Sequence, residues 1–140
     1  MSLPNKPTPE PRPRILLIDD DHVVLKALRK SLEPLGCEIL ISHDEEEALK
    51  AAIESPPAVI LSDINLVASE GHAVVRRLRE AGVNGVVIMI SGRVDNQDRI
   101  DALANGAMDC LRKPWSTPDL LNMVTRALRL HASQSKKSDS

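Results

Sequence analysis

Two apolar runs in the first half of this 140-residue chain end abruptly on aspartates. Arg14–Ile18 leads into Asp19 and Asp20, and residues 58–62 lead into Asp63. Runs of consecutive apolar residues are typical of strands covered on both faces of a parallel sheet, and the carboxyl ends of such strands meet at one edge. Gathered carboxylates raise one another's pKa unless a cation or protons neutralise them, and their hard oxygens suit Mg²⁺. The alternative is that these are ordinary loop and helix-cap aspartates, but two acid-tipped strands favour a site.

The elements that must position these acids alternate strictly between strand and helix. Strands are predicted at residues 14–18, 37–41, 58–63, 86–90 and 108–111, with a helix after each. This alternation predicts an α/β fold of parallel strands, right-handed crossovers and helices on both faces. No Gly-x-Gly-x-x-Gly follows the first strand, which disfavours a dinucleotide fold, and no Gly-Lys-Ser/Thr loop exists, which excludes a P-loop.

Caps and apolar spacing predict where the helices begin and which side they bury. Ser42 and Glu45 form a predicted capping box for the second helix. Thr117 is the predicted N-cap of the last helix, with Pro118 at its first position. The predicted buried stripe of the second helix is Leu49, Ala52 and Ile53.

Length and charge limit the function classes. The length predicts one domain, over residues 14–132, between a flexible Pro-rich tail (1–13) and a flexible tail or truncated linker (133–140). A net charge of −2 gives no reason to expect direct nucleic-acid binding. No segment is long enough to span a membrane and the start lacks a signal-peptide core, so we expect a cytoplasmic protein without membrane contact.

The four histidines do not predict a metal site. His22 lies beside the acids but is interpreted as an exposed first-turn residue of the first helix. The others, His43, His72 and His131, lack the spacing of a shared metal site.

From about Arg14 to His131 the chain resembles the receiver domain of two-component response regulators. The motifs that carry the resemblance are Ile18-Asp19-Asp20-Asp21, Leu61-Ser62-Asp63, Ile90-Ser91-Gly92 and Leu111-Arg112-Lys113-Pro114. Each motif alone is weak, but all of them in order, each at a strand end, are strong. The resemblance implies a flavodoxin-like, doubly wound five-stranded parallel sheet of order 2-1-3-4-5 with five helices.

The resemblance also implies a chemistry. Asp63 would accept a phosphoryl group from a histidine kinase or a phosphotransfer protein. The implied Mg²⁺ ligands are Asp19, Asp20, Asp63 and the backbone carbonyl of Asn65. Lys113 would pair with Asp63 and then with a phosphoryl oxygen, and Ser91 would donate its hydroxyl to another. Such a domain is not an enzyme with a separate substrate, because it catalyses only its own phosphorylation and dephosphorylation.

Three positions depart from the family pattern. Val67 replaces the usual Pro four residues after the phosphoacceptor, and Gly92 replaces a common Ala. Cys110 stands where the family has the aromatic ring that rotates with Ser91 during activation. Because a thiol sweeps little volume, we expect the Ser91–Cys110 switch to be small and the change to lie mainly in residues 92–106.

Two other functions compete with a phosphorylatable receiver. A pseudo-receiver would be a phosphorylation-independent interaction module; Val67 and Cys110 favour it slightly, whereas the retained acids and Lys113 argue against it. An aspartyl-nucleophile hydrolase usually has a second acid two residues after the first, where this chain has Asn65. The expected output is contact with a downstream effector protein or a missing C-terminal domain, and homodimer formation stays open.

The two cysteines are predicted to be free thiols. Cys37 and Cys110 fall on opposite edge strands of the implied sheet, roughly 19 Å apart at about 4.8 Å per strand spacing. A disulfide needs Cα atoms within about 7 Å.

Overall fold

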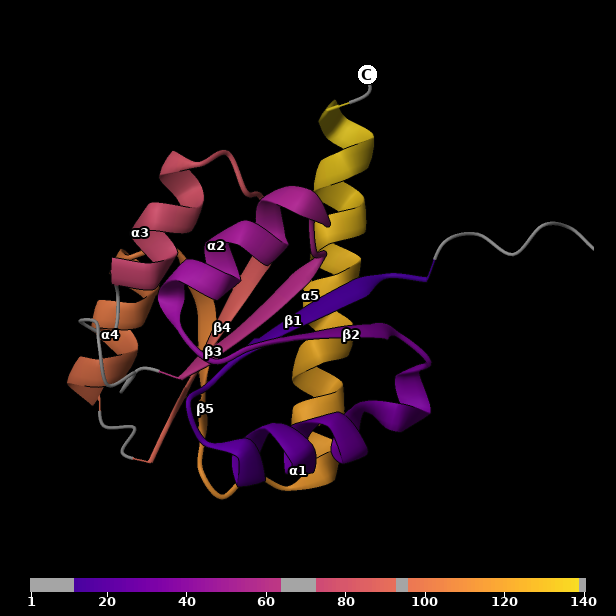
Figure 1. Cartoon of the computed structure of the whole chain (residues 1–140), viewed down its shortest axis with the longest axis vertical. Coiled ribbons are helices and arrows are strands. Elements are labelled where there is room, and N and C mark those ends of the chain that lie inside the picture. The colour runs from indigo at the N-terminus through magenta and orange to yellow at the C-terminus, as the bar shows by residue number, and fades with distance from the viewer. Residues whose placement is uncertain (1–11, 64–72, 93–95, 139–140) are drawn as a thin grey trace, which may run out of the picture.

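The computed structural model describes residues 12–63, 73–92 and 96–138. A five-stranded parallel sheet of order β2-β1-β3-β4-β5 lies between two layers of helices (Figure 1). The strands are β1 (Arg14–Ile18), β2 (Glu38–Ser42), β3 (Val59–Asp63), β4 (Val86–Ser91) and β5 (Ala107–Arg112). The helices are α1 (His22–Leu32), α2 (Glu45–Glu54), α3 (Ala73–Glu80), α4 (Asn96–Ala104) and α5 (Thr117–Ser138), and a short 3₁₀ helix (Glu33–Leu35) follows α1. The predicted fold class and strand order are confirmed.

Each face of the sheet has its own aliphatic core. Helices α1 and α5 cover one face, where Leu17 of β1 packs, and α2, α3 and α4 cover the other, where Leu16 packs (Figure 1). Since successive residues of a strand point to opposite faces, a strand between two helical layers needs apolar residues at every position. This requirement explains the unbroken apolar runs in the sequence.

The register of the central strands brings the acids to one edge. Ile18 of β1 is level with Ser62 of β3, so Asp19 and Asp63 are the next residue on each strand. Beyond the strand end, the amide of Asp19 still donates to the carbonyl of Ser42 at 3.1 Å, which keeps the loop after β1 against the loop after β2.

Helix α2 begins two residues later than predicted. Ser42 is the last residue of β2, and Asp44 is the N-cap, accepting from the amide of Glu47 at 2.8 Å. Ser42 and Glu45 therefore form no capping box; Asp44 displaces them because its carboxylate reaches the first free amides of the helix. The buried residues of α2 are Ala48, Leu49 and Ala52, whereas Ile53 is 58% exposed. Including Ile53 in the stripe was wrong.

Helix α5 also has a different cap from the predicted one. The Ser116 hydroxyl accepts from the amide of Asp119 at 3.1 Å, so Ser116 takes the N-cap role assigned to Thr117. The helix continues to Ser138 and includes most of the segment after residue 132 that the sequence predicts as a tail or linker. Among the described residues, no helix combines the length and the apolar character needed to cross a bilayer.

Neither Cys37 nor Cys110 forms a disulfide, as predicted. Cys37 lies half-buried just before β2, and burial raises the pKa of its thiol. Cys110 is buried in β5, at the opposite edge of the sheet.

We predict that Leu49→Ala costs about 2–4 kcal/mol of the free energy of unfolding, because Leu49 is only 9% exposed and truncation leaves a cavity. The matched change Ile53→Ala, on the exposed side of the same helix, should cost about 0.5 kcal/mol or less. Urea denaturation of both variants measures the difference. Equal losses of unfolding free energy in the two variants would show that Ile53 is buried like Leu49, as the sequence predicted and contrary to the structure.

Candidate functional site

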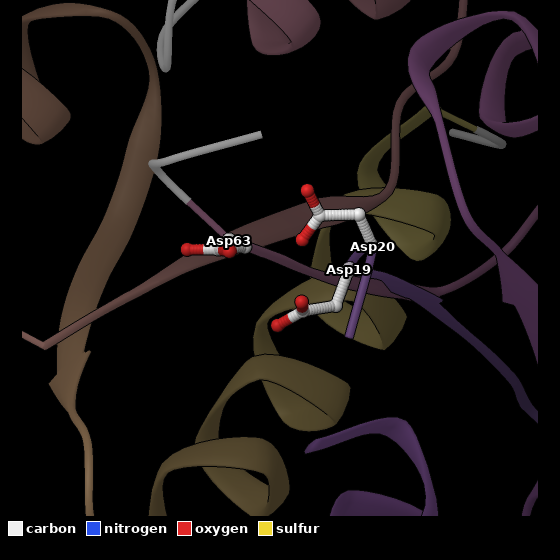
Figure 2. Close-up of side chains that lie close together, drawn as sticks. All are labelled: Asp19, Asp20 and Asp63. Carbon is white, nitrogen blue, oxygen red and sulfur yellow. The ribbon is translucent and has the colours of Figure 1, made fainter. Parts of the chain in front are cut away.

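Three carboxylates meet at the carboxyl ends of β1 and β3. One oxygen from each of Asp19, Asp20 and Asp63 lies within 4.8 Å of the other two (Figure 2). Asp19 and Asp63 are 1% and 6% exposed, and Asp20 is the most open to solvent. The structure thus brings together the acids on which the sequence prediction rested.

The start of α1 holds the first acid in place. Asp19 Oδ1 accepts from the amide of Asp21 at 2.9 Å, and Asp21 is itself the N-cap of α1, accepting from the amide of Val23 at 2.8 Å. These bonds satisfy amides that the turn into the helix leaves without partners. Asp19 Oδ2 is left to face the cluster.

Lys113 supplies the positive charge in the cluster. Its Nζ lies 3.1 Å from Asp19 Oδ2 and 3.5 Å from Asp63 Oδ2. Its amide donates to the carbonyl of Ser91 at 2.7 Å, which ties the end of β5 to the end of β4. The lysine therefore reaches the acids from a backbone position fixed against the neighbouring strand.

Burial dominates the electrostatics of Asp19. Removal from water raises the pKa of its carboxyl above 3.8, and the nearby charge of Asp63 raises it further. The hydrogen bonds from the Asp21 amide and the Lys113 ammonium act in the opposite direction without overcoming burial. The folded protein thus stabilises the neutral form of Asp19 unless more positive charge is present.

The charge balance of the cluster fits a divalent cation. Three ionised carboxylates and one ammonium leave two uncompensated negative charges, which equal the charge of one Mg²⁺ ion. The donors are hard carboxylate oxygens, which Mg²⁺ prefers, and the openness of Asp20 leaves room for the waters that this ion retains. Asp19, Asp20 and Asp63 therefore fit the metal that the sequence predicts.

The structure gives positions for only some of the other residues predicted to belong to the site. Ser91 is buried at the end of β4, one residue beyond the Ile90 that is level with Asp63. Cys110 lies in β5 within the core beneath α2, α3 and α4. Asn65 and Val67 lie outside the described residues.

One pair of residues near the site was missed in the sequence. The rings of His22 and His43 lie with centroids 4.7 Å apart, although the sequence predicted His22 only as an exposed first-turn residue and gave His43 no metal partner. A signal was present, because each histidine lies next to a helix N-cap, Asp21 or Asp44, in successive strand–helix loops. Linear spacing hides such a pair, whereas adjacent parallel strands bring these loops together.

Comparison with known proteins decides the family. Residues 15–125 match the model of the response regulator receiver domain. The chain belongs to this family. The strand order and the acid cluster of this receiver agree with the resemblance seen in the sequence motifs.

Curated relatives of this receiver are transcriptional regulatory proteins. It is 36% identical over 126 residues to the transcriptional regulatory protein PrrA of Mycobacterium bovis, a match that covers 90% of this chain and 54% of PrrA. It is 34% identical to the C4-dicarboxylate transport transcriptional regulatory protein DctD of Pseudomonas aeruginosa, covering 84% of this chain and 25% of DctD. The chain spans about half the length of PrrA and a quarter of DctD.

Solved structures share the fold. The signal receiver domain of an HD domain-containing protein from Pseudomonas fluorescens Pf-5 superposes with a TM-score of 0.83 at 26% identity, over 94% of this chain and 98% of that one. A CheY-like receiver domain protein from Methanospirillum hungatei JF-1 gives 0.80 at 26% identity, over 88% and 98%.

We predict that Asp19→Asn makes the metal-free protein more stable at neutral pH. The raised pKa means that Asp19 contributes stability at low pH and loses it as pH rises through the folded-state value, so the neutral amide avoids that loss. Its Oδ1 can still accept from the Asp21 amide.

Excess Mg²⁺ should reverse this order, because an ion that binds only the folded wild type stabilises it by mass action. Urea denaturation of both proteins over a pH series, with and without Mg²⁺, tests both points. A variant less stable than wild type at neutral pH without Mg²⁺ would contradict the dominance of burial.

Proposed function

We propose that this receiver accepts a phosphoryl group on Asp63, with Mg²⁺ held by Asp19, Asp20 and Asp63, from a phosphohistidine of a kinase or phosphotransfer protein. The observation that carries the proposal is the convergence of three carboxylates and the Lys113 ammonium at one edge of the sheet. The family membership of residues 15–125 supports it.

In the proposed reaction, an Asp63 carboxylate oxygen attacks phosphorus. The new P–O bond forms as the P–N bond to the donor imidazole breaks, and the imidazole keeps the electron pair and takes up a proton. Lys113, 3.5 Å from Asp63, neutralises part of the attacking carboxylate's charge and then pairs with a phosphoryl oxygen. Ser91, at the end of the next strand, donates its hydroxyl to another oxygen.

When bound, Mg²⁺ neutralises and orients the phosphoryl oxygens, which lets one anion approach another. Asp20 is the most exposed of the three acids, so we expect the donor to approach the cluster from its side. The backbone carbonyl of Asn65 completes the proposed protein ligands.

The alternative function is a pseudo-receiver that never accepts phosphate. Cys110 in place of an aromatic ring is the observation that favours it, because the usual readout of phosphorylation is absent. The convergence of the acids with Lys113 nevertheless supports phosphoryl transfer. Their mutual repulsion and burial destabilise the fold, which is hard to explain in a module that uses only its surface.

The proposed output is contact with another protein or with a further domain of a longer chain, in the cytoplasm. The relatives support a further domain, since the match spans 54% of PrrA and 25% of DctD. We place the receiver at residues 14–132 and keep homodimer formation as another form of output.

We predict that a small phosphodonor such as acetyl phosphate, with Mg²⁺, adds one phosphoryl group to the wild type, and that Asp63→Asn reduces labelling to background. Intact-mass measurement gives the stoichiometry. Glu54→Gln, which removes one exposed carboxylate at the end of α2, is the matched control and should label normally. Labelling of the Asp63 variant at the wild-type level would rule out the assigned acceptor.

We also predict that beryllofluoride changes hydrogen exchange mainly in residues 92–106 and changes the labelling of Cys110 less than about tenfold. Among its described side chains, α4 buries only Ala102, and Ile100 is 57% exposed, so little apolar contact holds this helix. Cys37→Ser leaves Cys110 as the single thiol for the rate measurement. Unchanged exchange in this segment together with a tenfold or greater shift at Cys110 would make the cysteine the switch.

A further inference from the structure

The imidazole rings of His22 and His43 are neighbours, although 20 residues of chain separate them. Their centroids lie 4.7 Å apart with an angle of 47° between the ring planes. His22 is the first residue of α1, directly after its N-cap Asp21, and His43 directly precedes Asp44, the N-cap of α2. Neither ring belongs to the acid cluster that serves the proposed phosphoryl transfer.

The fold brings the two histidines together through the pairing of β1 and β2. These strands are parallel neighbours with Ile18 level with Ser42, and the Asp19 amide extends the pairing by donating to the Ser42 carbonyl at 3.1 Å. The two loops that follow are therefore held side by side. Rigid strand ends fix the backbones of both loops, which limits the cost of ordering a ligand between them.

Glu47 contacts His43 in a way that favours one tautomer of its ring. Its Oε1 accepts from the backbone amide of His43 at 2.8 Å and lies 3.2 Å from Nδ1 of the same residue. A carboxylate against Nδ1 favours the tautomer with the proton on Nδ1, and Nε2 then carries the free lone pair. This carboxylate–imidazole arrangement is the one that orients histidine ligands in metalloproteins. Among the described residues, the ring nitrogens of His22 have no hydrogen-bond partner that would compete with a metal.

The ring separation matches two histidines on one ion. With metal–nitrogen bonds of about 2.0–2.1 Å, two imidazoles at adjacent positions of a tetrahedral or octahedral ion have centroids roughly 4.5–5.2 Å apart. The 4.7 Å between the centroids of His22 and His43 falls in that range.

We propose that His22 and His43 bind a divalent transition-metal ion of the Zn²⁺, Ni²⁺ or Cu²⁺ class, with Glu47 orienting His43 and water completing the coordination. Imidazole suits these ions, whereas Mg²⁺ takes hard oxygen ligands, so the receiver carries two adjacent cation sites of different chemistry. With two protein ligands, the histidine site binds less tightly than a structural zinc site with four. The proposal is independent of phosphorylation of Asp63.

The first test is calorimetric titration of the full chain with Zn²⁺ in excess Mg²⁺. We expect one Zn²⁺ per chain, with affinity reduced at least tenfold by His22→Gln or His43→Gln. His131→Gln, which removes a histidine from α5, is the matched control and should bind as wild type does. Unchanged affinity in both the His22 and the His43 variants would overturn the proposal.

The second test separates the histidines from the acid cluster. Asp20→Asn removes a carboxylate of that cluster and should leave Zn²⁺ affinity within about threefold; a tenfold loss here, with none in the His43 variant, would place the ion among the acids. Electron paramagnetic resonance of the Cu²⁺ complex of the wild type should show coupling to two imidazole nitrogens. A spectrum with oxygen ligands alone would overturn the proposal regardless of how the variants fold.

Discussion

The contact of the Lys113 ammonium with two buried carboxylates is the interaction on which the site depends. Two carboxylates within 4.8 Å repel by roughly 3–4 kcal/mol at the effective dielectric of a partly buried site, and burial adds to that cost. An ammonium 3.1 Å from Asp19 and 3.5 Å from Asp63 attracts each with an energy of the same size. Together these two attractions offset the repulsion between Asp19 and Asp63. Asp20 adds a third carboxylate, so the cluster keeps two negative charges that Lys113 does not neutralise.

The surrounding backbone determines where these charges lie. Lys113 reaches the acids because its amide is bound to the carbonyl of Ser91, which ties the loop after β5 to the end of β4. Asp19 is held from the other side by the start of α1. The charges are therefore placed by backbone hydrogen bonds from separate elements, and a shift in any of them changes the electrostatics of the site.

The sheet was predictable because its strands are buried on both faces. An unbroken run such as residues 86–90 leaves few alternatives, and the acids at the strand ends marked the edge that carries the site. Helix details were less predictable. Two polar residues, Ser42 and Asp44, could each have been the N-cap of α2. Asp44 is the N-cap because β2 extends through Ser42, and the pairing of β2 with β1 determines where β2 ends. Leu49 and Ala52 were correctly assigned to the buried side, but α2 packs through Ala48 as well, and this leaves Ile53 on the exposed side.

The sequence predicted the site residues that belong to motifs at strand ends. Lys113 and the three acids were all found in this way, although they come from three separate parts of the chain. The pair of His22 and His43 could not be found, because no single motif contains both and only the β1–β2 pairing makes them neighbours. Contacts across adjacent loops are a property of the topology, and they become visible once the strand order is combined with the position of each residue in its loop.

Helix α5 connects the site to the far end of the molecule. It begins three residues after Pro114, beside the acid edge, and its 22 residues extend about 33 Å, past the opposite end of the sheet (Figure 1). A tilt of roughly 5° about its first turn displaces its last turn by about 3 Å, a distance comparable to the width of a water molecule. A rearrangement around Lys113 that tilted α5 by this amount would therefore make or break a packing contact at the far end of the molecule.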